Sequence, residues 1–176
     1  MPLILPLLVH PLVTAIIEIP RGSATKYEYR EDRDALCRDE TDRSTLPLPA
    51  DYGFVPRARS EDGDLLDVFV LEINQAFPGT VVSVRPIGLL DMADDGGRDR
   101  KIIGIAEDAE AFAAVTDVRD VDDETREEIE RFLIAYKREN GQSLTLNGWH
   151  GRTEAYAAIT AARARCGPSP SLTMQV

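Results

Sequence analysis

The sequence is poor in positive charge. It contains 20 Lys and Arg residues against 31 Asp and Glu residues, which gives a formal net charge of −11 and an isoelectric point near 4.6. Proteins that bind nucleic acid need a basic surface for the phosphate backbone, and anionic membranes attract basic surfaces in the same way. We therefore expect neither nucleic acid nor a membrane as a partner. If the substrate is itself an anion, cations must mediate its binding.

Cysteine is also scarce. Cys37 and Cys166 are the only two, and neither has a partner at the spacing of a metal site. Two cysteines do not make the disulfide framework of a small secreted protein. Free thiols in a cytoplasmic protein are the expected state.

The sequence has no uninterrupted apolar run of the length that a membrane helix needs. Its first twenty residues are apolar, but they lack a basic segment and a cleavage site, and prolines interrupt them at positions 2, 6, 11 and 20. We expect an extended arm over residues 1–11 and a flexible tail over residues 167–176, which are rich in Gly, Pro and Ser. A length of 176 residues predicts one domain, 1–176, with a sizeable core.

What the sequence does contain is a series of short β-forming runs separated by turn residues. They predict six strands, over residues 13–19, 26–30, 52–55, 66–71, 80–90 and 101–106.

From about residue 122 the apolar residues recur with the spacing of a helix rather than that of a strand. Apolar residues from Ile129 to Tyr136 recur at i, i+3, i+4 and i+7, and Asn140-Gly141 supplies a stop. A second helix is predicted over 152–165, which is rich in alanine and basic near its end. These elements predict an α+β domain in which a β-barrel or strongly curved sheet has helices packed outside it.

Asp67 stands out in the predicted strand 66–71. Because side chains alternate along a strand, Leu66, Val68 and Val70 share one face, and Asp67, Phe69 and Leu71 share the other. Both faces are otherwise apolar, so the strand should be buried on both sides. A carboxylate in that position is costly unless something compensates it.

Acidic residues gather in clusters that contain neither His nor Cys. Such oxygen-only sets suit hard cations, Mg²⁺ above all, rather than zinc. Taken singly, each cluster is more typical of a solvated turn, and each lysine or tyrosine near it is typical of a surface or core-edge position. Their order along the chain carries more information. The clustered acids and the basic and tyrosine side chains that follow them lie in the segments EIP (18–20), KYE (26–28), DYGF (51–54), DGDLLD (62–67), DDGGRDRK (94–101) and YK (136–137).

The order and spacing of these segments resemble those of the soluble inorganic pyrophosphatases of the short, bacterial type. The resemblance covers about residues 13–165. It implies a five-stranded, OB-like β-barrel flanked by two C-terminal helices, and hydrolysis of pyrophosphate to two phosphates by a metal-activated hydroxide. It also implies three or four Mg²⁺ ions per site, with Mn²⁺ as an alternative, and a homo-oligomer, most often a hexamer.

The resemblance also implies a role for each matching residue. Asp62, Asp67 and Asp99 would hold a first metal ion, and Asp67 would bridge it to a second. Asp94 and Asp99 would hold a third ion. The remaining metal-site acids would be Glu18, Glu28 (through water) and Asp95, whose role is less defined. Asp64 would be the general base, and the phosphate oxygens would be bound by Lys26, Tyr52, Lys101, Tyr136 and Lys137.

The charges make metal ions necessary for binding as well as for chemistry. Eight site acids against three lysines leave five negative charges, which would strongly repel a tetra-anionic pyrophosphate. Metal ions reverse that balance, and a carboxylate at Asp67 is explained if metal ions lie beside it.

Two positions depart from the family pattern. The family has an arginine where this chain has Glu40, and a tyrosine where it has Leu48. The missing arginine would grip phosphate through paired hydrogen bonds. Arg38 or Arg43 could replace it. Two alternatives therefore stay open: a weakened or redirected relative that acts on another phosphoanhydride, and a non-catalytic, metal-binding OB-like module. The presence of Asp64 speaks against the second, since a binding module needs no general base.

Overall fold

The structure is a computed structural model that describes residues 11–42, 44–73 and 75–167. Apart from Pro11 and Gly167, the expected arm and tail lie outside the described residues. Within the described ranges, no helix is both long and apolar enough to cross a membrane.

The elements follow one another as strands first and helices later. In chain order they are β1 (Val13–Ile19), β2 (Tyr27–Arg30), β3 (Ala35–Arg38), β4 (Asp51–Arg59), β5 (Leu65–Leu71), β6 (Val81–Asp94), β7 (Gly97–Ala106), the 3₁₀ turns η1 (Glu110–Phe112) and η2 (Val118–Asp120), α1 (Asp123–Glu139), β8 (Leu144–Gly151) and α2 (Arg152–Arg165).

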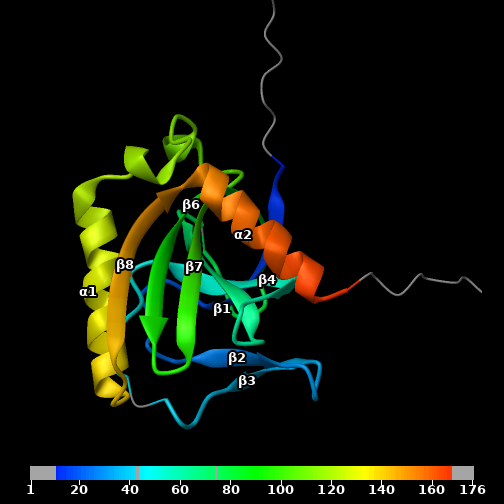
Figure 1. The fold of residues 1–176 in the computed structure, drawn as a ribbon, viewed down its shortest axis with the longest axis vertical. Helices are drawn as coiled ribbons and strands as arrows, with labels where there is room; N and C mark the ends of the chain where they lie inside the picture. Colours follow the sequence, from blue (N-terminus) through cyan, green and yellow to red (C-terminus); the bar gives the residue numbers. More distant parts are fainter. Residues whose placement is uncertain (1–10, 43, 74, 168–176) are drawn as a thin grey trace, which may run out of the picture.

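The α+β class and the five-stranded core are confirmed. Neighbouring strands pair in the order β1-β4-β5-β7-β6, and β1 also pairs with β6, so that these five strands form a closed ring. The pair β5–β7 is parallel, whereas the other pairs of the ring are antiparallel. Figure 1 shows α1 beside β8, α2 crossing the ring near β4, and β2 and β3 as a separate two-stranded sheet.

All six predicted strands are present, but two further strands were missed. β3 is only four residues long and pairs with β2. β8 contains Asn147-Gly148, a dipeptide that usually signals a turn. In the structure the same dipeptide forms a bulge, because Asp91 pairs with Gly148 while Met92 pairs with Leu146. Gly148 has a φ of +118°, a conformation that glycine accepts without strain.

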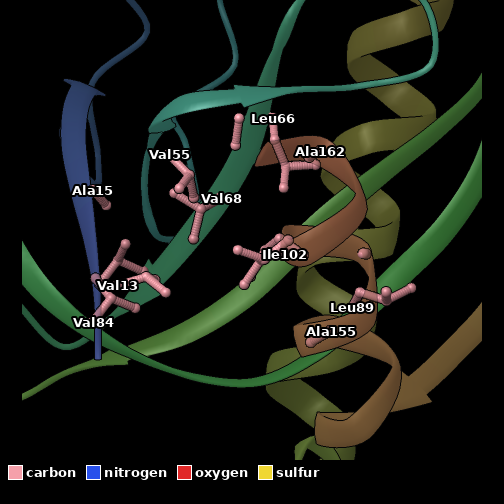
Figure 2. Close-up of a cluster of buried hydrophobic side chains, with 14 of the residues drawn as sticks. Val13, Ala15, Val55, Leu66, Val68, Val84, Leu89, Ile102, Ala155 and Ala162 are labelled. Atoms are coloured by element: carbon pink, nitrogen blue, oxygen red, sulfur yellow. The ribbon is translucent and has the colours of Figure 1, made fainter. Parts of the chain in front are cut away.

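The ring strands bury their two faces in two different apolar clusters, as predicted for residues 66–71. Leu66, Val68 and Val70 pack with the α2 residues Ala155 and Ala162, as Figure 2 shows in part. Phe69 and Leu71 pack on the other side, in a cluster that includes Ile129 and Leu133 of α1. Asp67 belongs to this second side, and the acidic side chains gather there.

Candidate active site

Lys101 of β7 lies at the centre of the acidic side chains. It is only 6% exposed, and its Nζ contacts Asp67 of β5 and lies 2.9 Å from Oδ2 of Asp99. The parallel pairing of β5 with β7 brings Asp67 beside Lys101. Burial lowers the pKa of the ammonium, but Asp67, Tyr52 and Asp99 outweigh it and hold the pKa well above its usual value. Two carboxylates, those of Asp67 and Asp99, therefore converge on one position that a positive charge occupies, here the Lys101 ammonium.

Tyr52 completes this centre from β4. Lys101 Nζ lies 5.8 Å from the centroid of its ring, and the charge of Asp67 acts on its hydroxyl. Burial and the neighbouring carboxylates of Asp67 and Asp99 raise the pKa of Tyr52 well above its ordinary value. The phenol therefore remains a neutral hydrogen-bond donor.

Asp62 and Asp64 lie on the tight turn that precedes β5. The turn is closed by hydrogen bonds from Asp64 N to Asp62 Oδ1 (3.0 Å) and from Ser60 N to Asp64 O (2.8 Å). Gly63 between them has a φ of +95°, which explains the glycine. Partial burial, followed by the charges of Asp62 and Asp67, raises the pKa of Asp64. A carboxylate with a raised pKa is a better proton acceptor at neutral pH.

Asp94 and Asp99 come from the hairpin that joins β6 to β7. Asp99 pairs with Met92 across the hairpin, so Asp99 and Asp94 share a face. Lys137 of α1 binds the Asp94 carboxylate, and Gly96 N donates to Asp94 Oδ1 at 2.8 Å. Burial raises the pKa of Asp94, but these bonds outweigh it and hold the pKa below its usual value. The predicted phosphate-binding lysine thus points into the site from the helix.

Glu18 lies on β1 at an irregularity in the pairing with β4. It is 8% exposed and accepts a hydrogen bond from Tyr29 N at 2.7 Å. Its pKa is raised to about 7 mainly by burial; the Tyr29 bond lowers it, and the charges of Asp67 and Glu28 raise it further. Glu18 and Glu28 therefore belong to the same acidic group as Asp67.

Lys26 and Tyr136 lie at the edge of the site near the two-stranded sheet. Lys26 Nζ pairs with Asp39 Oδ2 at 3.2 Å, and the pKa of Tyr136 is raised by burial and by the charge of Asp42, although Lys26 lowers it. Burial lowers the pKa of Lys26, but Tyr136 and Asp39 outweigh it and raise the pKa. Sequence reasoning missed Asp39 and Asp42, because both follow the unpredicted strand β3.

Three predicted site residues lie apart from this group or outside the described chain. Asp95 is exposed, and its carboxylate accepts hydrogen bonds from Ser143. Arg38 pairs with Tyr27, whereas Glu28 pairs with Cys37, so Arg38 lies on the face of the β2–β3 sheet away from Lys26 and Glu28.

Arg43 lies outside the described residues. Of the two residues that depart from the family pattern, Glu40 is exposed and Leu48 is buried.

The fit of the site to a metal ion depends on the kind and the spacing of its donor atoms. Among the residues in the described ranges, no three His, Cys, Asp or Glu side chains are close enough to hold a metal ion as they stand. The ammonium groups of Lys101 and Lys137 are bound to the predicted ligands instead. The side chains nevertheless fit a hard divalent cation. The donors are all oxygens, two of them share one cationic position, and burial together with neighbouring acids raises the pKa values of Glu18, Asp64 and Asp99.

Comparison with known proteins agrees with this arrangement. The family model for inorganic pyrophosphatase matches residues 15–166. The inorganic pyrophosphatase of Sulfolobus acidocaldarius is 38% identical over 147 residues, which cover 82% of this chain and 85% of that protein. The inorganic pyrophosphatase of Thermus thermophilus is 38% identical over 157 residues, which cover 88% of this chain and 90% of that protein.

The fold agrees as well. The crystal structure of inorganic pyrophosphatase from Thermus thermophilus superimposes with a TM-score of 0.83 and covers 89% of this chain and 92% of that chain. This chain belongs to the inorganic pyrophosphatase family, whose members are metal-dependent.

Proposed function

We propose that this chain hydrolyses inorganic pyrophosphate to two phosphates at the acidic group around Lys101, with Mg²⁺ as its cofactor. The observation that carries the proposal is the convergence of Asp67 and Asp99 on one cationic position. Family membership over residues 15–166 supports the reaction.

The residues divide into three roles in this proposal. The carboxylates that would hold three or four Mg²⁺ ions are Glu18, Asp62, Asp67, Asp94 and Asp99, with Glu28 acting through water and Asp95 at the margin. When bound, the ions would neutralise the charge of the substrate and lower the pKa of the attacking water. Asp64 would accept the proton from that water.

The remaining side chains would bind the phosphate oxygens. Lys101 and Lys137 now pair with acids that are proposed metal ligands. Divalent cations on those acids would free both ammonium groups to donate to phosphate. Together with Tyr52, Lys26 and Tyr136 they would spread the charge that develops on the departing phosphate.

The direct test is phosphate release from pyrophosphate with Mg²⁺, with Mn²⁺ and with excess chelator. We expect activity with Mg²⁺ and none with chelator. ATP and tripolyphosphate should be assayed in parallel. Glu40 and Leu48 differ from the family pattern on the side of the site that would bind phosphate, so the second candidate function is hydrolysis of another phosphoanhydride. Faster turnover of either compound than of pyrophosphate would select that second candidate.

Glu40→Arg should raise kcat/KM for pyrophosphate by about 10-fold or more. The exposed Glu40 follows Asp39, which binds Lys26 at the substrate edge of the site. A carboxylate there repels a phosphate, whereas an arginine adds charge-assisted hydrogen bonds of about 1.5–3 kcal/mol. Steady-state kinetics at saturating Mg²⁺ would measure the change.

Arg38→Ala and Arg43→Ala are the controls for this experiment. Arg38 lies on the far face of the β2–β3 sheet, so its removal should leave kcat/KM nearly unchanged. If Glu40→Arg lowered activity and either alanine variant were equally damaging, a neighbouring arginine would already bind the phosphate, and Glu40 would orient it.

We further propose that the chain forms a homo-oligomer, a hexamer by its resemblance to the short bacterial type, and that it is cytoplasmic. Large apolar side chains exposed on the single chain support an assembly: Phe77 is 68% exposed, Val81 66% and Ile134 48%. The unpaired thiols of Cys37 and Cys166 fit a reducing compartment. Sedimentation velocity at micromolar concentration should show a hexamer, and a monomer alone would contradict the proposal.

A further inference from the structure

A second group of charges lies on the opposite side of the hairpin that carries Asp99 and Lys101. Side chains alternate along β7, so Arg98 and Arg100 point away from the active site, toward α2. Ile102, the next residue on that face, packs in the cluster with α2, whereas Ile103 packs in the cluster with α1. The proposed catalytic residues do not involve this second group.

Asp91 of β6 is the buried centre of the group. Its side chain is 5% exposed and contacts Arg98. It also accepts a hydrogen bond from Asn147 Nδ2 at 3.3 Å, and His150 Nε2 lies 3.9 Å away. These bonds, led by the one from Arg98, lower the pKa of Asp91 despite its burial. The Asp91 carboxylate is thus already well supplied with donors.

Arg100 is different, because its acidic neighbours stand too far away for hydrogen bonds. Its Nε lies 3.8 Å from Asp91 Oδ2, and its Nη1 lies 3.7 Å from Glu61 Oε1. Both distances exceed the hydrogen-bond range. The planar guanidinium therefore has N–H groups directed at no close acceptor among the residues that the structure describes, although only about a quarter of its side chain is exposed.

A cavity of about 330 Å³ opens beside these side chains, between α2 and the β6–β7 hairpin. This volume is at the lower end of the range for small-molecule sites. Its apolar wall consists of Leu89, Ala157 and Ala158, and its polar wall is formed by Asp91, Arg98, Arg100, His150 and Glu154.

We propose that this cavity is a binding site for a small organic anion, with a carboxylate or phosphate head on Arg100 and an apolar body against Leu89, Ala157 and Ala158. Arg98 and Arg100 are balanced by Asp91 and Glu154, so the cavity has no strong net field to attract a bare inorganic ion. A ligand must then combine hydrogen bonds from the N–H groups of Arg100 with apolar contact to the wall of the cavity. This site does not depend on the proposed function, because it shares no side chain with the active site.

Isothermal titration of the metal-free, full-length protein with benzoate and with phenyl phosphate tests the proposal. The two probes share a ring and differ in the head group, which distinguishes carboxylate from phosphate recognition, and benzyl alcohol is the uncharged control. We expect at least one anion to bind, and benzyl alcohol not to bind. Arg100→Gln should weaken the binding by about 10-fold or more, since it removes a charge-assisted contact.

Two further variants separate the cavity from general charge effects. Ala157→Phe fills the cavity from exposed helix surface without changing any charge, and it should abolish binding. Arg131→Gln removes an equal charge from the exposed face of α1 and should leave binding unchanged. The proposal is overturned if neither anion binds, if benzyl alcohol binds as well as the anions do, or if binding survives both Arg100→Gln and Ala157→Phe in folded protein.

Discussion

Asp64→Asn should lower kcat for pyrophosphate by about 10²- to 10⁴-fold and leave the fold intact, because a general base contributes that much. Asparagine keeps the shape of the side chain but cannot accept the proton. The hydrogen bonds that close the turn use the backbone of residue 64 and the carboxylate of Asp62, so the turn itself should persist. Phosphate release at saturating Mg²⁺ measures the loss, and Mg²⁺ binding should change little.

Asp108→Asn is the matched control for Asp64→Asn. It makes the same exchange at an exposed position after β7, and activity should stay near the unmodified level. Undiminished turnover in Asp64→Asn would remove this carboxylate from the proposed mechanism.

Asp67→Ala should reduce Mg²⁺ affinity and activity together. Asp67 contacts Lys101, and its charge acts on Tyr52, Glu18 and Asp64. Since it is proposed to bridge two metal ions, its loss should weaken Mg²⁺ binding by at least about 10-fold, the effect commonly seen when even an indirect metal contact is lost. Calorimetry with Mg²⁺ and steady-state assays on the same preparation would measure both.

The two variants together distinguish a metal ligand from a base. Loss of activity with intact Mg²⁺ binding is expected for Asp64→Asn, and loss of both is expected for Asp67→Ala. Unchanged calorimetric binding in Asp67→Ala would show that the bridging role is wrong.

Local patterns were enough to predict most of the elements around the site, although not β3. The alternation in residues 66–71 predicted a strand buried on both faces, and the two clusters confirm it. A turn before a strand also placed Asp62 and Asp64 together. β8 could not be predicted in this way, because Asn147-Gly148 forms a bulge within a strand rather than a turn between strands.

Contacts between distant segments were beyond sequence reasoning. The contact of Lys101 with Asp67 depends on the register of the parallel pair β5–β7, which no local pattern encodes. The face on which Arg38 lies depends equally on the register between β2 and β3. Motif order predicted the members of the site, and only the pairing of strands shows which carboxylates contact the Lys101 ammonium.

The closed ring also sets the order in which a growing chain can assemble. Val13 pairs with Val84, and β7 must be inserted between β5 and β6, so the ring cannot close until Ala106 has been synthesised. The helices that cover both apolar clusters are made afterwards. A nascent chain released before α1 and α2 would therefore display Leu66, Val68 and Phe69 to solvent, where they invite aggregation. Synthesis of α2 is thus the step after which the apolar side chains of the ring are covered and the new chain no longer aggregates through them.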